Sequence, residues 1–184
     1  HNPDNSVNSQ GPPEAATIEM GMKPKARLWH SLRLLLLATG AAALVIGLWS
    51  GLVLIGAVPP GVTLQVADRH GAIMVCGFFG TLISLERAVA LGRGWAYAAP
   101  ALSAAGALTL VLADAGSIPI ALFLASGLVF TAASAMILLR FPALFTAILT
   151  VAAASWGIGT LLWLAGRPMA ESAGWWLAFL VLTV

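Results

Sequence analysis

Long apolar runs alternate with short turns that contain Gly, Pro or charged residues over most of the chain. Five of these runs are long enough to cross a bilayer, for which a helix needs about 20 apolar residues. Gly and Pro interrupt helices, so each turn separates one run from the next. The pattern therefore predicts an all-α, polytopic transmembrane helix bundle with five complete spans, at about 31–58, 70–92, 95–113, 118–139 and 142–165.

A sixth apolar run occupies about 174–184 and is too short to cross. At 1.5 Å per residue it covers roughly half of the hydrocarbon core. We expect it to be an incomplete sixth span, with a re-entrant or surface-lying segment as the alternative. The runs together define a bundle over 29–184. Residues 1–28 contain no apolar run and are rich in Asn, Ser, Pro and Glu, which predicts a disordered tail and no secretory signal peptide.

The composition agrees with a lipid bilayer as the main partner. Of the 184 residues, 60% are hydrophobic and only 9% are charged, against about 25% charged in soluble domains. The basic residues stand singly between apolar runs, so no basic patch for nucleic acid is formed. A soluble fold and a nucleic-acid partner are both excluded on this pattern.

The basic residues also predict an orientation. Loops on the cytoplasmic side of a membrane protein carry an excess of Lys and Arg. With a cytoplasmic N-terminus, only Arg69 and Arg167 of the nine Lys and Arg residues lie outside. We therefore expect a cytoplasmic N-terminal tail.

Tryptophans and small residues refine the bundle. Most tryptophans fall near the ends of runs, as interfacial anchors do. Trp49 and Trp156 lie deeper, and we expect both to pack between helices. Gly47 and Gly51 form a GxxxG pair that lets a neighbouring helix approach closely.

The second run has one face of small, polar or ligand-type side chains. At the helical repeat of 100° per residue, these side chains fall within about 80° of one another. We expect this face to point into the bundle and the opposite arc to meet lipid or apolar neighbours. The opposite arc consists of Gly71, Val75, Phe78, Phe79 and Leu82. The inward face consists of His70, Met74, Gly77, Thr81, Ser84 and Ala88.

His70 and Met74 are the candidate cofactor-binding residues. They are four positions apart, so both side chains can approach one metal ion or one haem edge. The alternative is that His70 caps the helix start while Met74 fills the core. Cys76 lies about 120° away from His70 and is a poor partner. His30 lies on the opposite side of the bilayer, so a second iron ligand must be Met74 or come from a further segment or subunit.

Glu86 and Arg87 lie near the other end of the same run, about 24 Å from His70 by helical rise. Arg87 is expected to anchor the topology by extending to the interface. Glu86 is expected to form an ion pair with an arginine at that end, and a proton-relay carboxylate is the alternative. No hydrolase, nucleotide-binding or pump motif is present, so we do not expect an enzyme.

The second run, HGAIMVCGFFGTLISLERAVALG, resembles the histidine-led helix of NnrS-type membrane proteins. The shared features are His70, the Gly77-Phe78 pair and the ending from Arg87 to Gly92. It also resembles a group of uncharacterised bacterial membrane proteins. The resemblance implies a multi-spanning bacterial inner-membrane protein that binds haem or copper and is linked to nitric-oxide stress. Only His70 carries over as a ligand, because the second histidine of that family's pattern is absent.

Three functions therefore stay open. The first is a haem- or copper-associated membrane protein with a role in nitric-oxide or respiratory metabolism. The second is a non-catalytic subunit that packs against a larger respiratory or photosynthetic complex or against itself. The third is a transporter or channel half, which the lack of deep charges or broken helices at mid-membrane disfavours.

Overall fold

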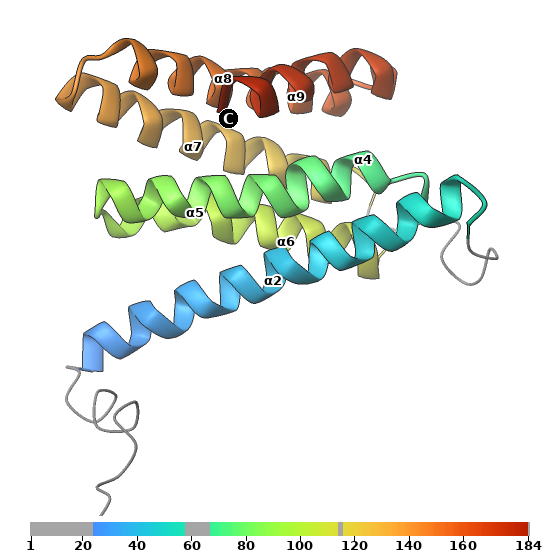
Figure 1. Ribbon diagram of the computed structural model, residues 1–184, viewed down its shortest axis with the longest axis horizontal. Helices are drawn as coiled ribbons and strands as arrows, with labels where there is room; N and C mark the ends of the chain where they lie inside the picture. The colour runs from blue at the N-terminus through green and yellow to red at the C-terminus, as the bar shows by residue number, and fades with distance from the viewer. Residues whose placement is uncertain (1–23, 58–66, 114–115, 184) are drawn as a thin grey trace, which may run out of the picture. The chain divides into compact units, whose positions relative to one another are not determined.

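The computed structural model describes residues 24–57, 67–113 and 116–183, and these residues are helical apart from short connections. The chain divides into two compact units, 1–34 and 35–184, and each is treated by itself. Of the first unit, the described part is the beginning of helix α2. The second unit holds the rest of α2 and all later elements (Figure 1).

The first span is α2 (Pro24–Leu54). Proline suits the first turn of a helix because its missing N–H would have no partner there. The helix therefore begins inside the predicted 1–28 tail, whose first 23 residues lie outside the described part. Most of the loop expected between the first two spans, and Asp114 in a later turn, also lie outside it.

The second span is continuous from His70 to Leu91 but is not uniform. It begins as α4 (His70–Ala72), passes through the π-helical segment η1 (Ile73–Phe79) and continues as α5 (Gly80–Leu91). Gly92, with φ +65°, ends it in the left-handed conformation that glycine adopts without strain.

The remaining helices follow one another with short turns. A 3₁₀ turn, η2 (Gly94–Tyr97), leads into α6 (Ala98–Leu112). The bundle then continues with α7 (Ile118–Arg140), α8 (Leu144–Leu164) and α9 (Met169–Thr183). Neighbours in sequence from α5 to α9 pack against each other, and α5 also contacts α7.

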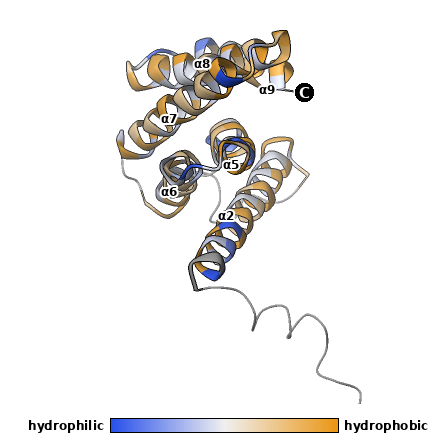
Figure 2. Ribbon diagram, turned by 90° about the vertical axis from the view of Figure 1, so that its left-hand side faces the viewer, coloured by the Kyte–Doolittle hydropathy of each residue, from blue (hydrophilic) through white to orange (hydrophobic). Residues whose placement is uncertain are grey.

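The predicted fold class is confirmed. Five described helices are long and apolar enough to cross a membrane by length and composition. Large apolar side chains are exposed on every one of them, and Figure 2 shows hydrophobic residues along much of α7 and α8. Such a surface suits lipid as its solvent. The sixth helix, α9, has 15 residues and begins before the predicted start at 174.

The core of the second unit is built around Trp156 on α8, whose side chain is fully buried. Its ring stacks on Phe179 of α9, with centroids 5.5 Å apart, and meets Phe130 of α7 edge to face at 5.9 Å. The expectation that Trp156 packs between helices is confirmed. For Trp49 it is wrong, because that side chain is 48% exposed on α2.

Candidate functional site

The start of the second span is fixed by an arginine. The Arg69 guanidinium donates a hydrogen bond of 2.9 Å to the carbonyl of Leu110, in the last turn of α6. Carbonyls at a helix C-terminus lack partners within the helix and attract positive charge. Arg69 therefore ties the residue before His70 to another helix. Sequence reasoning assigned Arg69 only to the outer side of the membrane and missed this contact.

A backbone carbonyl of α2 orients the His70 ring. Its Nδ1 lies 2.7 Å from the carbonyl oxygen of Gly47. A carbonyl oxygen only accepts hydrogen bonds, so Nδ1 must carry the hydrogen. In the neutral ring, the lone pair is then on Nε2. Metal-binding histidines are commonly oriented in this way, with one ring nitrogen donating to a carbonyl and the other facing the metal.

The GxxxG pair makes room for this arrangement. A Cβ atom at Gly51 would lie only 3.0 Å from Cε1 of His70 and 3.3 Å from its Nδ1. A Cβ atom at Gly47 would lie 2.8 Å from Cγ of Met74 and closer still to its Sδ. The two glycines therefore receive the His70 ring and the Met74 side chain, one helical turn apart. The pair has a specific role that its low sequence specificity did not reveal.

Met74 lies in the same seam, between α2 and the second span, with its sulfur directed at Gly47. The structure thus brings both predicted ligands to one helix pair. Within residues 24–57, 67–113 and 116–183, no three His, Cys, Asp or Glu side chains gather in a group that could hold a metal ion. Ligation by His70 or Met74 stays a prediction.

The π-helical segment η1 interrupts the regular α-helical repeat of the second span. A π-helix bonds i to i+5, so its side chains advance more slowly around the axis than in an α-helix. Gly77, Thr81, Ser84 and Ala88 are buried, as predicted for the inward face. Cys76, in the same segment, is also completely buried. Short π-helical segments are frequent at functional sites.

Cys76 belongs to the core rather than to the seam at His70. Its sulfur accepts a hydrogen bond of 3.2 Å from Nε1 of Trp156, and its carbonyl accepts one from the hydroxyl of Ser103. Ser103 in turn accepts from Thr81 at 3.0 Å. These bonds join the second span to α6 and α8, whereas His70 contacts α2. The expectation that Cys76 is a poor partner for His70 agrees with this geometry.

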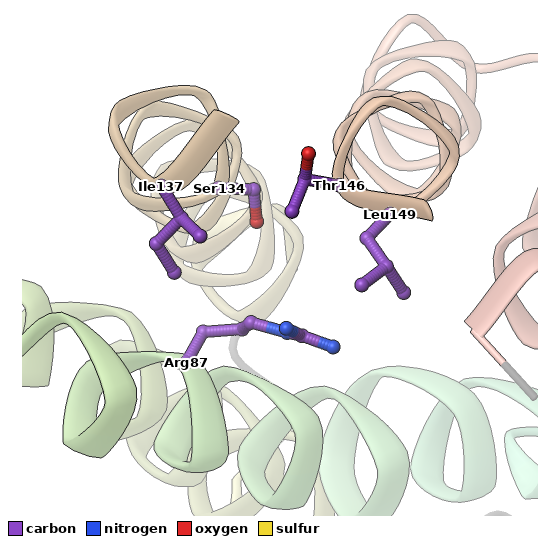
Figure 3. Close-up of a pocket in the computed structure, with 5 residues that line it drawn as sticks. All are labelled: Arg87, Ser134, Ile137, Thr146 and Leu149. Carbon is purple, nitrogen blue, oxygen red and sulfur yellow. The ribbon is translucent and has the colours of Figure 1, made fainter. Parts of the chain in front are cut away.

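The two residues of the predicted ion pair at the other end of the span differ in burial. Nη2 of Arg87 lies 3.9 Å from Oε1 of its neighbour Glu86, whose side chain is 68% exposed. The Arg87 side chain is only 16% exposed and enters a narrow pocket between α5, α7 and α8 (Figure 3). It therefore lies between helices instead of extending to the surface as an anchor. The pocket is lined by Arg87, Ser134, Ile137, Thr146 and Leu149.

Comparison with known proteins gives a family without an assigned activity. No curated protein and no solved structure matches the chain. One family model matches residues 33–184, and its description is Domain of unknown function (DUF8744). The match contains every described span from α4 onward and most of α2. The chain belongs to the DUF8744 family.

Proposed function

We propose that this membrane protein binds haem through Nε2 of His70 and takes part in nitric-oxide or respiratory metabolism. The observation that supports the proposal is the hydrogen bond from Nδ1 to the Gly47 carbonyl, which sets the tautomer and orientation that a ligand histidine needs. The resemblance of the second span to the histidine-led helix of NnrS-type proteins points the same way.

Haem suits the available donors better than a bare copper ion does. A porphyrin supplies four nitrogen ligands itself, so one histidine is enough to hold the iron. Copper needs its ligands from protein, and the described residues offer only Met74 beside His70 as a soft donor. Met74 would have to turn its sulfur away from Gly47 to reach the metal.

A haem bound at His70 also needs apolar cover for its ring. The α2 helix is the least buried of the five spans, with Leu48 and Leu52 exposed close to the glycine pair. A second membrane protein, or a second copy of this chain, seated on this part of α2 would supply that cover. The same exposed surface supports the second candidate function, a non-catalytic subunit of a larger membrane complex.

The His70→Ala variant tests the haem proposal. We expect the full chain, purified after expression with added haem precursor, to show a Soret band and about one haem per chain, on the premise of one histidine per iron. H70A should lose the band because the iron ligand is gone. His30→Ala is the matched control, since His30 lies in the other unit, and it should keep the band.

The outcomes separate the two candidates. Copper that is present in the wild type and lost in H70A, without a Soret band, would keep His70 as a ligand but replace haem by copper. A wild-type preparation with neither haem nor copper would contradict the proposal and leave the subunit function. A Soret band that survives in H70A would place the ligand elsewhere.

A further inference from the structure

We propose that Arg87 and Ser134 form a binding site for a phosphate oxyanion at the end of the second span away from His70. This site is independent of the haem proposal. Its parts come from three helices of a single unit, α5, α7 and α8, and α7 packs against both of the others.

The first support is that the Arg87 guanidinium is enclosed and only weakly paired. Its side chain is largely enclosed by Ile137, Leu149 and the neighbouring helices. Among the described residues its only charged partner is Glu86, at 3.9 Å and mostly in solvent. An ion pair at that distance with an exposed carboxylate contributes little. A guanidinium in such surroundings favours an oxyanion that can accept two parallel N–H bonds.

The second support is an unsatisfied hydroxyl. Ser134 is 3% exposed, and its Oγ has no hydrogen-bond partner among the described residues. Other hydroxyls in these helices bond to the carbonyl four residues earlier, as Thr131 does with Gly127 on the same helix. Burying a hydroxyl without a partner costs free energy. In Figure 3 the Ser134 oxygen points toward the side of the pocket where Arg87 lies.

Thr146 of α8 also lines the pocket, but its hydroxyl, unlike that of Ser134, has hydrogen-bond partners. Thr146 already accepts from the backbone N–H of Ala143 and donates to carbonyls of its own turn, and its oxygen points away from Arg87 in Figure 3. Thr146 lies in the first turn of α8, whose N-terminal end carries a partial positive charge. The charge at this end of the pocket is thus positive from both α5 and α8.

The pocket is too narrow to hold a separate water molecule between its side chains. The Arg87 side chain lies in this space (Figure 3). An oxyanion would therefore bind as the guanidinium turns toward the mouth, and the space that the side chain leaves would let one phosphate oxygen accept from the buried Ser134 hydroxyl. The exposed charges near this end are Glu86, Arg93 and Arg140. The apolar side chains of Leu144 and Phe145 are exposed beside Thr146 and would accompany the acyl chains of an anionic phospholipid. Free phosphate presents the same oxygens but has no acyl chains.

Lipid retention by the full chain tests the proposal. Native mass spectrometry would count bound phosphatidylglycerol and phosphatidylcholine on the wild type, R87Q, R87K and S134A. We expect a preference for phosphatidylglycerol that R87Q abolishes and R87K weakens, because lysine cannot bind in the bidentate manner. S134A should weaken it about fivefold, as expected for one lost hydrogen bond. R93Q, at an exposed arginine of the same end, should leave it unchanged.

A second arm separates the two sources of phosphate. Inorganic phosphate that stabilises the wild type but not R87Q against thermal unfolding, without lipid preference, would support the site with free phosphate as its ligand. S134A removes only an unpartnered oxygen, so we expect this variant to fold. It therefore still tests the site if R87Q does not fold. Equal lipid preference in wild type, R87Q and S134A together with no phosphate effect would overturn the proposal. An equal loss in R93Q and R87Q would also overturn it.

Discussion

Replacing Trp156 by alanine is expected to destabilise the helix bundle by about 3 kcal/mol or more, the usual cost of removing a large buried aromatic side chain. The indole is fully buried between α7, α8 and α9, where it contacts Phe130 and Phe179. Its Nε1–H also donates to the sulfur of Cys76. The substitution therefore leaves a cavity and removes a hydrogen bond from the π-helical segment.

The buried Cys76 thiol can report the loss of stability. Cys76 is the chain's single cysteine and is buried, so a thiol-reactive dye should label it only when the bundle opens. We expect labelling of W156A at a markedly lower temperature than the wild type. Trp156→Phe, which keeps an aromatic ring, should fall between them.

The matched control is Trp49→Ala, because this side chain is largely exposed on α2. It should leave the labelling temperature nearly unchanged. Similar losses in W49A and W156A would contradict the assignment of the core to Trp156. Size-exclusion chromatography of W156A at low temperature would distinguish lower stability from local exposure of Cys76 in an intact fold.

Replacing Gly80 by alanine is expected to have the next largest effect. A Cβ atom at this position would lie 2.7 Å from Cζ2 of Trp156 and 3.0 Å from Oγ of Ser103. Alanine favours a helix over glycine by up to about 1 kcal/mol. Forcing an extra carbon into a packed core costs about 1–3 kcal/mol. The indole is enclosed on all sides and cannot move away, so the clash should outweigh the helix propensity.

Gly71→Ala provides the control, since a Cβ atom there would meet no other atom within 4 Å and Gly71 occupies the same span. G71A should be as stable as the wild type or slightly more stable in the Cys76 labelling assay. The double variant G80A/W156F should be less destabilised than the sum of its single changes, because the smaller ring relieves the clash. Strict additivity would indicate that Gly80 and Trp156 do not meet.

The spans themselves could be predicted because bilayer thickness imposes long apolar runs. The predicted 70–92 and 118–139 match His70–Leu91 and Ile118–Arg140 within two residues at each end. The start of α2 at Pro24 was missed because its first turn is polar and carries no hydropathy signal. The orientation in the membrane and the haem ligand stay predictions.

The site could be predicted only in part, because its decisive contacts are tertiary. His70 and Met74 were chosen from their spacing, yet nothing local indicates that Gly47 and Gly51 receive them. The bond between Trp156 and Cys76 joins residues 80 positions apart. The π-helical segment has no sequence signature, and the unpartnered Ser134 becomes visible only when α7 packs near Arg87.

The most direct test of the central claim is the tautomer of His70 in the full chain without cofactor. Nitrogen-15 NMR of histidine-labelled protein, at a pH where the ring is neutral, distinguishes protonated from unprotonated ring nitrogens, and H70Q assigns the signals. We predict that Nδ1 carries the proton, bonded to the Gly47 carbonyl, and that Nε2 does not. A proton on Nε2 instead would contradict the orientation of His70 as a ligand.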